Sequence, residues 1–146
     1  MSRKLLMTLV AAVFVLALPV SADEKPTEAY QKAMRDNGEA LQAVRAAAKE
    51  IEDSGAGAQD YAPFEKATAT MKTTFATTLA FWQARKVDDA VKMAQEGARL
   101  VVDLEAAAKD RDYRVVRASF TALGDTCAAC HMAHRVRLPD GTYEIK

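Results

Sequence analysis

The sequence is poor in the features that mark most enzymes and most nucleic-acid-binding proteins. Its 20 basic side chains are matched by 20 acidic ones, so it has no surplus of Lys and Arg with which to bind phosphates. It has no glycine-rich phosphate loop, no nucleophile turn of the G-x-S-x-G type, and no recognisable general base. We therefore expect neither a nucleic-acid partner nor enzymatic activity, and we assign no catalytic residues.

Cysteine is scarce as well, and both cysteines of the 146 residues lie close together near the end of the chain. They are Cys127 and Cys130 in the stretch LGDTCAACHMAHRVR, residues 123–137, and His131 follows directly. A C-x-x-C-H run is compatible with a zinc site, a redox dithiol, a disulfide or a covalently attached haem. These four interpretations imply different functions.

The first 22 residues have the pattern of a secretory signal peptide. Arg3 and Lys4 precede an apolar run from Leu5 to Val20, and small residues end the segment at Ala22. The alternative is a retained membrane anchor, but the 16-residue run is shorter than the roughly 20 residues that span a bilayer. We expect cleavage after about Ala22, export to the periplasm, and a mature domain of residues 23–146 with no membrane contact.

The mature chain shows the helical period of apolar residues in four segments and no β-rich run. In the first segment, a series that is apolar except for Asn37 recurs in alternating steps of four and three from Tyr30 to Ile51, which indicates one face of a bundle helix. Thr27 and Asp88 are candidate N-caps, and Pro63 is placed where the start of a helix tolerates proline. The predicted helices cover about 27–51, 63–85, 88–108 and 111–135, followed by a short tail at 136–146 with a turn at Asp140-Gly141.

Four helices of this length with short connections predict an all-α fold, an antiparallel up-down-up-down four-helix bundle. Alanine is abundant in all four segments. Small residues let helices approach closely, but they leave volume unfilled unless a large group lies between the helices. The composition therefore favours a bound prosthetic group.

Of the four interpretations of the cysteines, haem attachment accounts for every residue of the motif. A zinc site needs three or four protein ligands, and His131 and His134 on one helical turn cannot easily complete a tetrahedron with both thiolates. A reactive dithiol usually lies at a helix N-terminus, and a disulfide across three residues stabilises little. Haem uses both thiols as thioethers and His131 as the proximal iron ligand, and on a helix Cys127, Cys130 and His131 project from one face.

With this motif at the end of an exported bundle, residues from about Thr27 to Arg135 resemble the class II c-type cytochromes. This family comprises cytochrome c-prime and low-spin relatives such as cytochrome c-556. An arginine four residues after the histidine also fits, here Arg135. The stretch YQKAMRDNGEAL in the first helix resembles the c-556 branch, and this resemblance implies Met34 as the sixth, distal iron ligand. The longer tail after Arg135 departs from the family pattern.

The level of each methionine along the bundle can be compared with that of His131. His131 lies about 6 Å from the end of the fourth predicted helix and Met34 about 10 Å from the start of the first, so both lie near one end. Met93 has a suitable level and remains the rival ligand. Met71 is placed too far along the second helix, and Met132 and His134 share the helix of His131 and cannot reach the opposite haem face.

Three further residues are expected near the haem: Trp82 against the porphyrin edge, and Arg135 and Tyr30 as other pocket contacts. With Met34 bound, one covalent haem c would be low-spin and would carry single electrons between periplasmic redox proteins. With the sixth position empty, as in cytochrome c-prime, the protein would instead bind nitric oxide or carbon monoxide. Relatives also form homodimers, although the sequence shows no clear interface.

Overall fold

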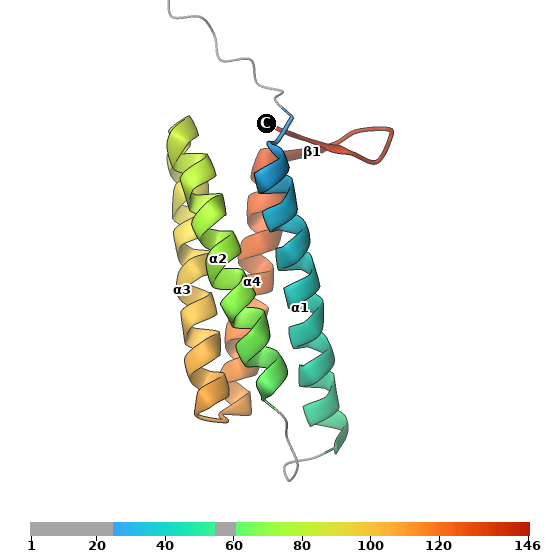
Figure 1. The fold of residues 1–146 in the computed structure, drawn as a ribbon, viewed down its shortest axis with the longest axis vertical. Coiled ribbons are helices and arrows are strands. Elements are labelled where there is room, and N and C mark those ends of the chain that lie inside the picture. The colour runs from blue at the N-terminus through green and yellow to red at the C-terminus, as the bar shows by residue number, and fades with distance from the viewer. Residues whose placement is uncertain (1–24, 55–60) are drawn as a thin grey trace, which may run out of the picture.

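The computed structural model describes residues 25–54 and 61–146, so the predicted leader and the glycine-containing segment after the first helix lie outside the described residues. Four long helices are followed by a short antiparallel hairpin (Figure 1). This confirms the predicted fold class. The elements are α1 (Glu28–Ser54), α2 (Ala62–Arg85), α3 (Asp88–Lys109), α4 (Tyr113–His134), β1 (Arg135–Arg137) and β2 (Tyr143–Ile145).

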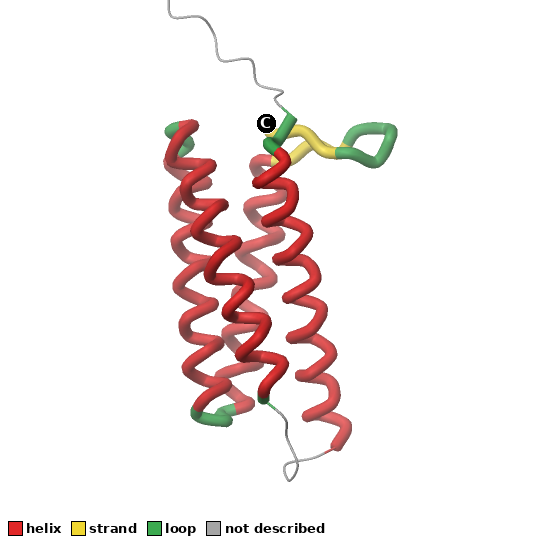
Figure 2. The backbone as a smooth tube through the Cα atoms, viewed as in Figure 1, coloured by secondary structure: helices red, strands yellow, loops and turns green. Residues whose placement is uncertain are grey.

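The helices run alternately up and down, and each packs against the next one in the chain. Close backbone contact joins α1 with α2, α2 with α3, and α3 with α4, whereas α1 and α4 share at most a marginal contact. The seam between α1 and α4 therefore lacks close backbone packing; side chains bridge it at the end away from the hairpin, and cavities occupy its other end. The smooth backbone trace shows the hairpin leaving the bundle at the end where α1 begins and α4 ends (Figure 2).

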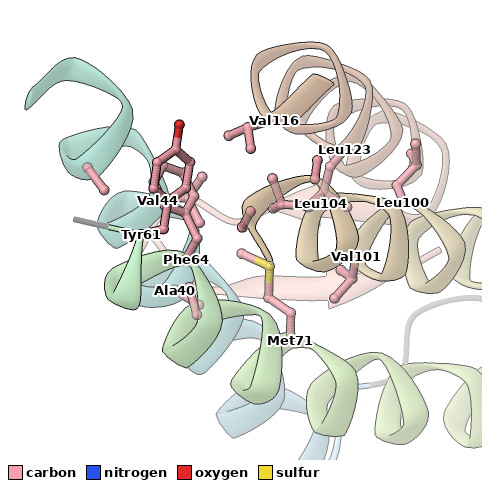
Figure 3. Packing of buried hydrophobic residues seen from close by; sticks show 14 of the residues in the cluster. Ala40, Val44, Tyr61, Phe64, Met71, Leu100, Val101, Leu104, Val116 and Leu123 are labelled. Carbon is pink, nitrogen blue, oxygen red and sulfur yellow. The ribbon is translucent and has the colours of Figure 1, made fainter. Parts of the chain in front are cut away.

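The main hydrophobic core lies inside the bundle and draws on all four helices. In Figure 3, Val44 from α1, Met71 from α2, Leu104 from α3 and Leu123 from α4 point toward a common centre. All four are at most 1 % exposed. A second cluster of buried residues occupies the end of the bundle that carries the hairpin; it consists of Tyr30, Phe81, Trp82, Ala90, Ala94 and Ile145.

The contact between α2 and α3 depends on a glycine. A Cβ atom added at Gly97 would lie 2.2 Å from Cε1 and 2.6 Å from Cζ of Phe75, far inside carbon–carbon contact distance. Only glycine lets the aromatic ring of α2 lie against the backbone of α3. Gly97 is thus retained inside a helix for packing, although glycine there costs about 1 kcal/mol relative to alanine.

The predicted cap at Thr27 forms, and α4 has a further side-chain cap, at Asp112, that was not predicted. The Oγ1 atom of Thr27 accepts a hydrogen bond from the Tyr30 backbone N–H at 3.3 Å, and Asp112 accepts one from Val115 N–H at 3.1 Å. The expected cap at Asp88 is wrong, because Val87 is the N-cap and Asp88 already belongs to the first turn of α3. There its carboxylate interacts favourably with the positive end of the helix dipole but does not cap a backbone N–H group.

Helix α1 is three residues longer than its apolar pattern indicates, reaching Ser54 instead of Ile51. The hydroxyl of Tyr113, at the start of α4, lies 2.8 Å from Oε1 of Glu52 and 3.1 Å from the carbonyl oxygen of Ala48. This tertiary contact supports the last turn of α1. A pattern of apolar residues cannot reveal it, because the residues involved are polar.

The segment after Arg135, predicted only as a short tail with a turn at Asp140-Gly141, keeps that turn and adds two paired strands that were not predicted. Helix α4 ends at His134, and β1 and β2 pair with Arg135 opposite Ile145 and Arg137 opposite Tyr143. Leu138 N–H donates to the Thr142 carbonyl at 2.9 Å, and Gly141 turns the chain with a φ of 84° that favours glycine. Residues 135–146 thus form an ordered hairpin.

Within residues 25–54 and 61–146, no helix is both long enough and apolar enough to cross a membrane.

Candidate functional site

Two adjoining cavities lie along the open seam between α1 and α4. The outer cavity, of about 520 Å³, is bounded by the start of α1, the end of α4 and the hairpin. The inner cavity, of about 110 Å³, extends from there into the bundle toward α2. Four residues line both: Tyr30, Met34, Cys130 and His131. The residues of the C-x-x-C-H motif and the predicted distal methionine are therefore brought together.

The two cysteines project from one face of α4, as the helical spacing requires. Cys127 lines the inner cavity and Cys130 lines both cavities, and both are half-buried and not joined to each other. Burial raises the pKa of Cys127, and burial together with the neighbouring Cys127 raises that of Cys130 to about 11. Reactive dithiols and thiolate metal ligands need the opposite shift. Both thiols stay protonated and available for addition to a cofactor.

His131 is half-buried in the wall of both cavities. Burial, and secondarily the positive charge of Arg135, lower the pKa of His131 below its usual value. The imidazole is therefore neutral at pH 7, which is the form that coordinates a metal ion. His131 thus has both the position and the protonation state that a proximal iron ligand needs.

The methionines differ sharply in their relation to these cavities. Met34 of α1 lines both and faces the same space as His131 of α4. Met93 lines neither cavity, and Met132 is 72 % exposed. Met71 also lines the inner cavity, but it lies midway along α2, and its side chain points into the core and is 1 % exposed.

Aromatic side chains form one wall of the outer cavity. Tyr30 stacks on Phe81 with ring centroids 3.8 Å apart, and Trp82 meets both rings edge-on. Tyr30 and Trp82 line the outer cavity, as expected for pocket residues, and Phe81 lies behind them. Burial raises the pKa of Tyr30 to about 12, so its hydroxyl stays protonated. This wall is rigid and largely apolar.

His134 is a pocket residue that the sequence analysis considered only as a ligand of zinc or iron. It is 8 % exposed, lines the outer cavity, and packs against Trp82 with ring centroids 5.0 Å apart. Its Nε2 lies 3.2 Å from Oδ2 of Asp89, although the two are not aligned for a hydrogen bond. His134 thus joins α4 to α2 and α3 beside the cavity.

The charged groups of the outer cavity were mostly missed by the sequence analysis. Arg135 was expected there and does line it, together with Lys25, Arg35 and the carboxylate of Asp140. Hydrogen bonds from Thr142 and the charge of Lys25 hold the pKa of Asp140 below its usual value, so it is ionised at pH 7. Because Lys25 and Asp140 lie far apart in the sequence, only the fold brings them together.

The arrangement fits a covalently attached haem. The two cavities together form a slot between α1 and α4. The volume of the outer cavity alone, about 520 Å³, falls within the roughly 300–1,000 Å³ of typical cofactor sites. Two thiols and a neutral imidazole stand on one side of this slot, with a thioether on the other and cationic groups at its mouth. These are the groups that an iron porphyrin with two carboxylates would use.

Comparison with known proteins agrees with this chemistry. The sequence matches the family model described as Cytochrome C' over residues 22–135. No curated protein and no solved structure matched. Members of this family are non-enzymatic periplasmic proteins that carry one covalent haem c. The match includes all four helices and the C-x-x-C-H motif, and therefore the chain belongs to the Cytochrome C' family of haem proteins.

Proposed function

We propose that this protein is a mono-haem electron carrier of the low-spin, c-556-like kind, with His131 and Met34 as the two axial ligands. Family membership supplies the covalent haem and implies redox partners. The finer assignment depends on one observation: Met34 and His131, from helices that do not otherwise pack closely, line both cavities from opposite sides of the same open seam.

Each residue of the proposed site has a defined task. When bound, haem c would supply a one-electron couple at the iron, and Cys127 and Cys130 would hold it to α4 through thioether bonds. His131 would coordinate the iron as a neutral imidazole, and Met34 would take the position that a gas or water molecule could otherwise fill. A methionine ligand and an apolar surround both raise the reduction potential.

Rapid electron exchange also requires a site that changes little between oxidation states. Met34 is on the second turn of a long helix, and Tyr30, one turn earlier, is held by stacking on Phe81. On the other side, His131 belongs to the continuous helix α4. Because both ligands lie on helices rather than loops, little reorganisation accompanies the transfer.

The cellular setting follows the same proposal. Residues 1–22 are the proposed leader, removed on export to the periplasm, where donor and acceptor proteins exchange single electrons with the haem. Loss of Arg3 and Lys4 with this leader makes the mature chain slightly acidic. Its charge offers no strong attraction to partners of either sign.

Replacement of the distal ligand tests the assignment. Met34→Ala should leave the haem attached but open the iron to carbon monoxide, while Met93→Ala, the matched control, should leave the iron closed. The measurement is the change in the reduced absorption spectrum on adding carbon monoxide. If Met93→Ala opens the iron instead, the ligand assignment is wrong. If the unaltered protein already binds carbon monoxide, the gas-binding alternative replaces electron transfer.

A further inference from the structure

Apart from Arg135, the C-terminal hairpin lies outside the family match, which ends at residue 135, yet it forms a wall of the outer cavity. We propose that this hairpin is a cover that shields the carboxylate-bearing edge of the haem from solvent and helps to neutralise it. The proposal rests on the haem site of the proposed function, but it does not depend on the identity of the sixth ligand.

One face of the hairpin is directed to the cavity. Arg135, Tyr143 and Ile145 line the outer cavity, whereas Val136 and Glu144, which pair with each other on the opposite face, do not. Successive side chains of a strand point to opposite faces, so this is the alternation expected of a strand pair with one face toward a ligand. The Arg135 guanidinium lies 3.9 Å from the centre of the Tyr143 ring, which holds the cation on the cavity side.

The hairpin is anchored at the end next to the haem-bearing helix. Ile145 is 8 % exposed and belongs to the buried cluster with Tyr30 and Trp82, the aromatic wall of the cavity. The C-terminal Lys146 donates from its backbone N–H to the His134 carbonyl at 3.1 Å and from Nζ to the Met132 carbonyl at 2.9 Å. These carbonyls at the end of α4 would otherwise lack partners. The cover and the turn of helix carrying His131 thus stabilise each other.

The charges around the outer cavity complement a dianion. Three cationic side chains, Lys25, Arg35 and Arg135, and one carboxylate, Asp140, line it, leaving two positive charges uncompensated. The two carboxylates of a haem carry the opposite charge. Arg135 and Asp140 belong to the hairpin segment, and Asp140 also lies close enough to Lys25 for that charge to lower its pKa. The turn of the hairpin therefore helps to position a cation at the mouth of the cavity.

A cover of this kind has a measurable electrical consequence. Shielded carboxylates near cations interact strongly and are little affected by dissolved ions, whereas exposed charges are screened. Loss of the cover admits water and salt to the haem edge, and a more solvent-exposed haem has a lower reduction potential. The hairpin should therefore keep the potential both higher and less dependent on ionic strength.

The test compares holoproteins that differ in the hairpin. One variant ends at Arg137 and lacks β2, and a full-length variant, Ile145→Ser, loses the buried anchor. The matched control is Glu144→Ala, on the strand face directed away from the cavity. We expect the truncated and Ile145→Ser proteins to have a lower reduction potential and a steeper dependence of that potential on ionic strength, together with altered Soret circular dichroism. Glu144→Ala should be unchanged in all three.

Two results would overturn the proposal: an unchanged potential and salt dependence in both hairpin variants, or equal shifts in Glu144→Ala. If neither hairpin variant yields holoprotein, Tyr143→Ser decides, because it removes the 37 % exposed ring from the cavity wall and keeps the Ile145 anchor. Failure of the proposed function is seen separately, as carbon monoxide binding by the unaltered protein. The comparison of potentials applies whether that iron is five- or six-coordinate.

Discussion

Replacement of Gly97 by alanine probes how closely α2 packs beside the haem cavity. The new Cβ atom would lie 2.2 Å from Cε1 of Phe75, whereas carbon atoms in good contact are about 3.5–4.0 Å apart. The ring must therefore retreat by roughly 1.5 Å. Phe75 lines the inner cavity, so the retreat takes it toward space that we assign to the haem.

The magnitude follows from two opposing effects. Overpacking a core typically costs about 1–3 kcal/mol, and replacing glycine by alanine inside a helix returns about 1 kcal/mol. Gly124→Ala in α4 is the matched control, because nothing lies within 4 Å of its added Cβ atom and only the helix-propensity gain applies. The difference in free energy of unfolding between the two variants should therefore be about 1–3 kcal/mol, which isolates the clash.

Thermal unfolding of the holoproteins, followed by far-ultraviolet circular dichroism, measures this difference. At about 3–5 °C per kcal/mol for a chain of this size, Gly97→Ala should melt roughly 3–15 °C below Gly124→Ala. The haem spectrum of Gly97→Ala should also shift, because Phe75 presses on the cofactor. Equal melting temperatures for the two variants would refute the packing at Gly97 described above.

Three further predictions concern the cysteines, a helix cap and the hairpin turn. Cys130→Ala should lose one thioether, so its holoprotein yield should fall; undiminished attachment, measured as colour retained after denaturation, would contradict the haem assignment. Asp112→Ala should lower the free energy of unfolding by about 1 kcal/mol in urea titrations, because it removes the acceptor for Val115 N–H, and an unchanged midpoint would contradict the cap. The pKa of Asp140 is lowered in the folded state by Thr142, so its contribution to the turn is complete above the usual carboxyl pKa of 3.8 and is lost as the pH falls through the lowered value. Protection of the amides in residues 138–146, taken relative to their intrinsic exchange rates at each pH, should therefore fall on acidification, and Asp140→Asn should lose part of this dependence.

Apolar period and small-residue composition were enough to predict the bundle. Alternating steps between Tyr30 and Ile51 predict one stripe facing the bundle; Tyr30, Val44 and Ile51 of this stripe are buried, and Met34 and Leu41 line the inner cavity. The abundance of alanine predicted unfilled volume, and the structure locates that volume along the seam between α1 and α4. What could not be predicted were contacts between polar groups distant in the sequence, such as Tyr113 with Glu52.

The site was predictable where spacing on one helix determines geometry. Cys127, Cys130 and His131 share a face because residues three and four apart do so on any α-helix. The charged mouth of the cavity was not predictable, because Lys25 and Asp140 come from opposite ends of the described chain. The position of a methionine along its predicted helix does not distinguish Met34 from Met93 as the distal ligand. The cavities do distinguish them, because Met34 lines both cavities and Met93 lines neither.

The sequence contains a weak indication of the hairpin, of which only the turn was predicted. Asp140-Gly141 predicts a turn, and the residues on either side alternate between apolar or aromatic and charged side chains, as short strands do. Three-residue strands are too short for this pattern to be distinctive. Their stability comes instead from Ile145 in the aromatic cluster and from the contacts of Lys146 with the end of α4.

The most direct test of the central claim is the absorption spectrum of the exported protein, oxidised and reduced, with and without carbon monoxide. Axial ligation by His131 and Met34 predicts sharp low-spin bands that carbon monoxide leaves unchanged, and a weak band at the red end of the oxidised spectrum from the methionine–iron bond. Broad high-spin bands that shift with carbon monoxide would contradict it, leaving Met34 as a packing residue beside an open iron.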